Sequence, residues 1–71
     1  LAAARPELLT ALATDPSPVE REAAGRGLAR GAARAGTDER DAARDALERA
    51  RSHESDEAAA AGLRHSLGEL G

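Results

Sequence analysis

Cysteine, methionine, lysine and all three aromatic amino acids are missing from this chain of 71 residues. Without cysteine, neither a disulfide nor a thiolate metal site is possible. Phenylalanine, tyrosine and tryptophan, the residues on which nucleic-acid bases commonly stack, are missing, and without lysine the cations are ten arginines. Because the formal net charge is also −3, we expect the chain not to bind nucleic acid.

Long apolar runs are missing as well. No run approaches the roughly 18 residues that a membrane span needs, and the first residues do not have the charged and apolar pattern of a secretory signal. These features predict a cytoplasmic protein without membrane contact. Because the chain begins with Leu1, we also expect it to be a piece of a longer protein or a processed product.

The apolar residues that could form a core are nineteen alanines, nine leucines and one valine. A fully buried branched side chain contributes about 1.5–3 kcal/mol, whereas ordering the backbone costs about 1–2 kcal/mol per residue. With so few branched side chains, we expect the chain alone to be marginally stable and to gain from a neighbouring protein surface.

The abundant residues favour helices. Alanine, leucine, arginine and glutamate are strong helix formers, whereas the residues that prefer strands amount to one valine and three threonines. Prolines and glycines divide the chain into four segments, so the sequence predicts one all-α domain, residues 1–71, with four helices. We expect two antiparallel helical hairpins or, as the alternative, a small four-helix bundle.

The turn between the first two helices has the clearest signals. Asp15, Pro16, Ser17 and Pro18 must interrupt the helical pattern, because proline lacks an amide donor and restricts the residue before it. Ser17 and Glu20 have the S-x-x-E spacing of a capping box, and Pro18 suits the first position of a helix. The second helix is therefore predicted to begin directly after Ser17.

The other helix ends have weaker signals. Gly36 and Thr37 are expected to end the second helix, and Thr37 or Asp38 to cap the third. Ser52 or Ser55 is expected to open the fourth helix.

Each predicted helix has one apolar face that should point inward. The expected inward residues are Leu8, Leu9 and Leu12 in the first helix; Ala24, Leu28, Ala32 and Ala35 in the second, with Ala23 and Gly27 beside them; Ala43, Ala46, Leu47 and Ala50 in the third; and Ala59, Ala60, Leu63, Leu67 and Leu70 in the fourth.

The chain is partly similar to itself at an offset of 35 residues, which lies within the range of helical repeats. The matching positions are Ala11-Leu12 and Ala46-Leu47, Ser17 and Ser52, Glu22-Ala23-Ala24 and Glu57-Ala58-Ala59, Gly27-Leu28 and Gly62-Leu63, and Gly36 and Gly71. The serine, glycine and leucine matches carry more weight than the alanines. We therefore predict two repeat units, residues 1–36 and 37–71.

The stretch "LLTALATDPSPVEREAAGRGLARG" resembles a HEAT repeat of the kind found in bacterial proteins and in phycocyanobilin lyase-like chains. The similarity lies in a leucine-bearing first helix, an Asp-Pro-x-Pro turn, an arginine, paired alanines and a leucine one turn on. It implies a fragment of an α-solenoid in which Asp15 and Arg21 support the turn and the stacking of repeats. The second unit lacks the Asp-Pro turn; Val19 is displaced by one position and aligns with Glu54.

Glycines at positions 25, 27 and 31, with arginines between them, could indicate a phosphate-binding loop. Such a loop needs a preceding strand, a helix that begins inside the loop and, in the Walker motif, a lysine. The sequence has none of these, so we interpret the glycines as places where helices cross closely. The expected packing residues are Gly27, Leu28, Gly62 and Leu63.

Arg26, Arg30 and Arg34 are spaced four residues apart and would line one outer face of the second helix. They could form a docking strip for an acidic partner helix or for phosphates. The interpretation that we favour from the sequence is a solvated face on which Glu22 pairs with Arg26. Residues 1–36 carry about +1 and residues 37–71 about −4, an asymmetry that favours contact between protein units over DNA binding.

The two histidines, His53 and His65, are the only side chains whose ordinary pKa lies near neutral pH. Neither has the paired-histidine helix spacing of a zinc protease. No nucleophile has a base beside it in a recognisable pattern. We therefore expect no metal, no cofactor and no enzymatic activity.

Stacked helical repeats usually bind other macromolecules and rarely catalyse reactions. The sequence thus predicts a non-catalytic scaffold for protein–protein interaction, as a segment of a larger protein. Its partner would be another protein or further repeats of the same chain, with a homodimer as a further option. The alternative is a small helical docking or dimerisation domain of a multi-domain biosynthetic enzyme, which rests only on size and helicity.

Overall fold

A computed structural model describes residues 5–71. These residues form four α-helices and no strand: α1 (Arg5–Thr14), α2 (Pro18–Ala33), α3 (Thr37–His53) and α4 (Glu57–Glu69). The predicted all-α fold with four helices is confirmed.

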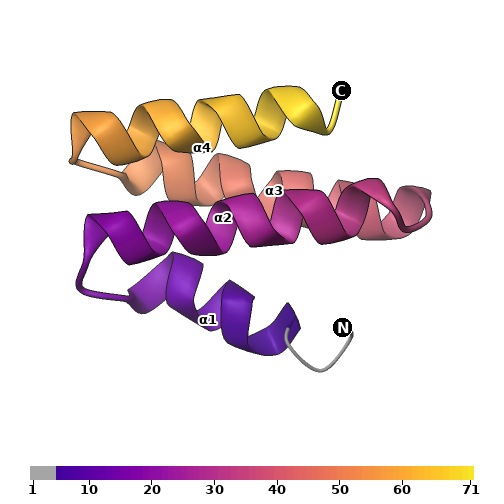
Figure 1. The fold of residues 1–71 in the computed structure, drawn as a ribbon, viewed down its shortest axis with the longest axis horizontal. Helices are drawn as coiled ribbons and strands as arrows, with labels where there is room; N and C mark the ends of the chain where they lie inside the picture. Colours follow the sequence, from indigo (N-terminus) through magenta and orange to yellow (C-terminus); the bar gives the residue numbers. More distant parts are fainter. Residues whose placement is uncertain (1–4) are drawn as a thin grey trace.

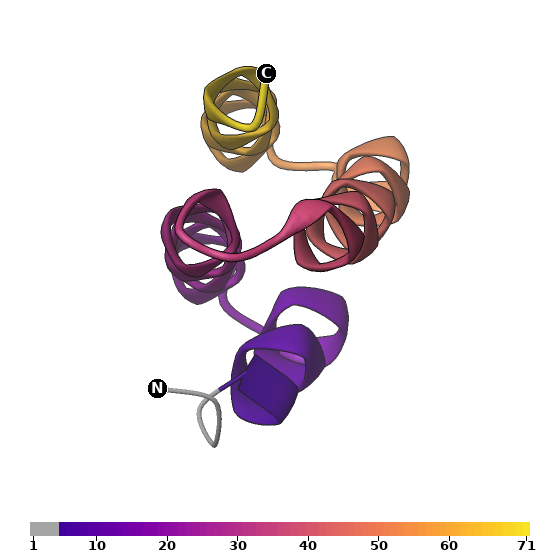
Figure 2. The same cartoon turned by 90° about the vertical axis from the view of Figure 1, so that its right-hand side faces the viewer.

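The helices form two layers. Consecutive helices run antiparallel (Figure 1), and the view along their axes places α1 and α3 in one layer and α2 and α4 in the other (Figure 2). Helix α2 packs against all three other helices, whereas within residues 5–71 α1 and α4 do not contact each other. The structure is therefore a stack of two helical hairpins in which α2 and α4 are adjacent.

Four leucines at the centre of the stack form the core. Leu12, Leu28, Leu47 and Leu63, one from each helix, are at most 4% exposed. Small residues between them let the helices approach closely. A Cβ atom at buried Gly25 would lie 2.6 Å from Leu63 Cδ2 and 2.9 Å from Leu47 Cδ2, so only glycine fits there. The predicted close helix crossing at Gly25 agrees with these distances.

The predicted inward residues are buried or partly buried except Leu9 and Ala35, and Ala29, which is 1% exposed, was not expected inside. Leu9 is 40% exposed, because Leu8 and Leu12 occupy the side of α1 that faces the core. Ala35 is exposed, because α2 ends at Ala33 and Ala35 lies in the following turn. In addition, Ser66 is only 1% exposed although it was not expected inside, and its Oγ has no hydrogen-bond partner.

Two predicted helix caps are wrong. Gly36, with an extended backbone and no side-chain cap, precedes α3, and Thr37 is already its first residue. Helix α3 continues through Ser52, whose Oγ donates to the carbonyl of Arg49 at 2.9 Å. The N-cap of α4 is therefore Asp56, whose Oδ2 accepts from the Ala59 amide at 2.9 Å.

The leucines related by the 35-residue offset have similar burial, whereas Ser17, Glu22 and Ala23 are partly buried and their counterparts Ser52, Glu57 and Ala58 are exposed. Leu12 and Leu47 are both buried, as are Leu28 and Leu63. The helix starts do not follow this offset: the N-caps of α2 and α4 are Ser17 and Asp56, so α4 begins about one turn later than its sequence counterpart. The division into repeat units stays a prediction.

Candidate protein-interaction surface

The two turns at one end of the stack are joined through Arg21, near the start of α2. Its Nε and Nη2 donate to Glu54 Oε1 and Oε2, both at 2.8 Å, and its Nη1 donates to the carbonyl of Asp15 at 2.7 Å. Asp15 lies in the turn before α2, whereas Glu54 ends α3. One guanidinium thus holds the α1–α2 turn against the α3–α4 turn, in the two-pronged geometry that makes arginine–carboxylate pairs strong.

Glu54 is the most electrostatically perturbed group in the described chain. Its side chain is only 2% exposed, and Oε2 also accepts from the Asp56 amide at 3.1 Å. Hydrogen bonds from Arg21 lower the pKa of Glu54 from 4.5 to about 2. Sequence reasoning noted this glutamate only as a departure from the repeat pattern, because its partner lies 33 residues away in the chain.

The Asp-Pro turn has the local bonds that its residues predict. Asp15 Oδ1 accepts from the Ser17 amide at 2.9 Å, and Ser17 Oγ accepts from the Glu20 amide at 3.4 Å. Ser17 is the N-cap of α2 and Pro18 its first residue. Pro16, which lies between Asp15 and Ser17, is exposed. Because Asp15 takes the Ser17 amide, the reciprocal bond of a capping box is replaced by a bond within the turn.

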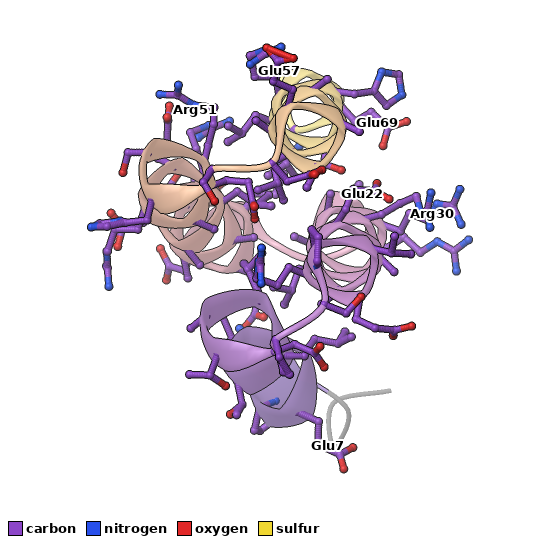
Figure 3. The ribbon with its side chains drawn as sticks, turned by 90° about the vertical axis from the view of Figure 1, so that its left-hand side faces the viewer. Glu7, Glu22, Arg30, Arg51, Glu57 and Glu69 are labelled. Atoms are coloured by element: carbon purple, nitrogen blue, oxygen red, sulfur yellow. The ribbon has the colours of Figure 1, made fainter. Side chains whose placement is uncertain are left out.

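The arginine row on the outside of α2, defined as Arg26, Arg30 and Arg34, is exposed along its whole length. Figure 3 shows Arg30 pointing away from the helix stack. Arg26 Nη1 lies 3.5 Å from Glu22 Oε2, whereas Arg30 and Arg34 form no ion pair within residues 5–71. The C-terminal part of the row is therefore left to interact with molecules outside the described chain.

Most other arginines are already paired within the protein. Ion pairs in the described part of the chain join Arg5 to Glu39, Arg21 to Glu54, Arg26 to Glu22, Arg44 to Asp41, Arg49 to Asp45 and Arg51 to Glu48. Only Arg40 and Arg64, outside the row, resemble Arg30 and Arg34 in having no such pair among residues 5–71. The row is thus the place where two unpaired arginines follow each other on one helix face.

The glycine and leucine pairs predicted for packing do lie between helices. A Cβ atom at Gly27 would be 3.4 Å from Leu8 Cδ1, and one at Gly62 would overlap the side chain of Glu22. Leu28 and Leu63 belong to the core. Gly31 differs from these, because nothing lies within 4 Å of a Cβ placed there.

Two cavities flank the crossing of α1 and α3. One, of about 830 Å³, lies between α1, the C-terminal half of α2 and the N-terminal half of α3; we call it the α1–α3 groove. The other, of about 720 Å³, lies at the end of the stack where the two turns meet, and Arg21 and Glu54 line it. In this cavity the polar atoms of the Arg21 guanidinium and the Glu54 carboxylate already bond each other.

The histidines are not gathered into a site. His53 Nδ1 lies 2.9 Å from the carbonyl of Arg49 at the end of α3, and His65 Nε2 lies 3.7 Å from Glu69 Oε2 on α4. No three side chains of the metal-binding types come together in residues 5–71. In the same residues, no helix is both long and apolar enough to cross a membrane.

No protein-family model, curated protein sequence or solved structure matches this chain. The similarity to HEAT repeats therefore stays a prediction, and functional inference depends on the surfaces described above.

Proposed function

We propose that the chain is a non-catalytic scaffold for protein–protein interaction, built of HEAT-like repeats and part of a larger protein. The stack of two parallel-oriented hairpins supports this proposal, because α1 and α4 occupy its two ends and pack on neighbours from one side only (Figure 2). In stacked repeats each unit contacts only the next, and about three units are normally needed for a continuous core. Further repeats or another protein would cover the end helices.

The arginine row is the surface on which we expect a partner protein to bind. Arg30 and Arg34 are exposed, have no ion pair within residues 5–71 and lie four residues apart on the outside of α2. Unpaired cations on a rigid helix attract an oppositely charged surface and raise its rate of association. A protein partner fits better than nucleic acid, because the chain has a net charge of −3 and no phenylalanine, tyrosine or tryptophan on which a base could stack.

Affinity capture with a charge-reversed variant tests this function. The wild-type chain, expressed in the cell from which it comes, is compared with a variant in which Arg26, Arg30 and Arg34 are all replaced by Glu. A matched control carries the same change of net charge on α3 and α4, at Arg40, Arg51 and Arg64. We expect a protein that is retained by the wild type and by the control but lost from the variant. If wild type, variant and control all retain the same protein equally, the arginine row is solvated surface without a role in binding. If the wild type retains no protein, the scaffold function is contradicted.

A further inference from the structure

The α1–α3 groove lies where α1 diverges from α2. The two helices separate toward the N-terminal end of α1 (Figure 1). The volume of about 830 Å³ lies within the range of about 300–1,000 Å³ that is typical of ligand sites. The groove thus opens at the end of the stack opposite to Arg21 and Glu54.

Small side chains keep this groove open. Its α2 wall carries Gly31 and Ala32, and its α3 wall carries Ala42, Ala43 and Ala46. Leu8 and Leu9 on α1 supply larger apolar side chains at one edge of the groove. Walls of glycine and alanine cannot fill the space between three helices, so a complementary occupant must bring bulky apolar side chains of its own.

The charges on the groove's rim are uneven. Arg5 pairs with Glu39 across the mouth, and Arg49 pairs with Asp45 on α3. The remaining charged residue that lines the groove, Arg34, has no ion pair within residues 5–71 and is the last member of the arginine row. An occupant therefore meets apolar walls and, at one edge, unneutralised positive charge.

We propose that the α1–α3 groove binds an amphipathic acidic helix of a partner protein, an inference that rests on the proposed scaffold function. Bulky apolar side chains of that helix occupy the space between the alanine walls, as in other helix-in-groove complexes. A carboxylate on its flank meets Arg34, the cation without an ion pair at the edge of the groove. An extended peptide fits less well, because residues 5–71 contain no strand with which it could pair.

A synthetic peptide makes the proposal measurable. The probe is a fluorescein-labelled peptide of four helical turns with leucines at i, i+3, i+4 and i+7 and glutamates beside them. Its affinity for the chain is measured by fluorescence anisotropy at low and high salt. We expect saturable binding that weakens with salt, and weakens about tenfold when the glutamates are replaced by lysine or the leucines by alanine.

Two variants test the groove itself. Gly31→Leu places a bulky side chain where nothing lies within 4 Å of the new Cβ, and it replaces a poor helix former by a good one. The fold should be retained while peptide affinity falls tenfold or more. Gly68→Leu is the matched control, because nothing lies within 4 Å of a Cβ at this α4 position either. Arg34→Glu should also weaken binding about tenfold, whereas Arg64→Glu, also on α4, should leave it unchanged.

The outcomes separate this inference from the function on which it rests. If the wild-type chain does not bind the peptide, or Gly31→Leu binds it as tightly as Gly68→Leu does, the groove is not the binding site. A dimer in sedimentation that Gly31→Leu dissociates would mean that a second copy occupies the groove, which also overturns the proposal. A different outcome is that Gly31→Leu and wild type capture the same protein, while the variant with the reversed arginine row does not. This result would contradict binding in the groove but would still support the scaffold function.

Discussion

Replacing Glu54 by glutamine should destabilise the fold in a pH-dependent way. Glutamine keeps the shape of the side chain but removes the charge that two N–H groups of Arg21 contact at 2.8 Å. The pKa of Glu54 is lowered from 4.5 to about 2, a difference that corresponds to at most about 3–4 kcal/mol. Because the Arg21 side chain is 22% exposed and solvent screens part of the attraction, we expect a loss of about 2 kcal/mol at pH 7.

The pH dependence follows from the direction of this pKa. Since folding lowers the pKa, the stabilisation is fully present above the unfolded value of 4.5 and is lost as the pH falls toward the folded value of about 2. The difference between wild type and Glu54→Gln should therefore be constant from about pH 7 to pH 5. By about pH 3 it should be less than half as large.

Urea denaturation followed by circular dichroism at several pH values is the assay. A domain of this size has a free energy of unfolding of about 4–10 kcal/mol, so the variant should still fold. Glu48→Gln is the control, because Glu48 has a 53% exposed side chain and pairs with Arg51 on the same helix. A Glu54→Gln loss no larger than that of the control, or one that persists unchanged at pH 3, would refute the assigned role of the ion pair.

Three further predictions concern stability and are checked by thermal unfolding, in which 1 kcal/mol shifts Tm by about 4–8 °C. Gly25→Ala should lower the stability by about 1–3 kcal/mol, because its Cβ would lie 2.6 Å from a buried leucine. Gly31→Ala should raise the stability by about 0.5–1 kcal/mol, because no atom lies within 4 Å of the new Cβ. Equal changes in Tm for the two variants would contradict the close packing at Gly25. Ser66→Ala should stabilise by about 1 kcal/mol, because the serine Oγ is buried without a partner; a lower Tm would indicate a missed hydrogen bond. Asp56→Ala should lower the stability by about 0.5–2 kcal/mol, and Ser55→Ala should leave it almost unchanged. A larger loss for Ser55→Ala than for Asp56→Ala would mean that Ser55 is the N-cap of α4, as the sequence predicted.

The helices and their inner faces could be predicted because they depend on local chemistry. Ser17 and Pro18 begin α2 as their spacing indicates, because a cap and a proline act within one turn of the helix. Leu12, Leu28, Leu47 and Leu63 are buried as the helical period predicts. In these cases the sequence neighbourhood contains nearly all of the interactions that decide the structure.

The features that sequence reasoning missed depend on residues far apart in the chain. Glu54 lies between a histidine and a serine in an acidic stretch and gives no local sign that Arg21 will bind it. A close crossing at Gly25 could be predicted, but its contacts with Leu47 and Leu63 depend on how α2 crosses α3 and α4. The α1–α3 groove likewise depends on how α1 diverges from α2 and has no motif.

The link between Arg21, Glu54 and Asp15 also bears on how the molecule can deform. This link lies where the α1–α2 and α3–α4 turns meet, at the end of the stack opposite to the α1–α3 groove (Figure 1). At the groove end, the pair between Arg5 and Glu39 is about 40% exposed on both sides and contributes little. We therefore expect α1 to pivot about its C-terminal end, so that the groove can widen or narrow around side chains of different size without disturbing the core.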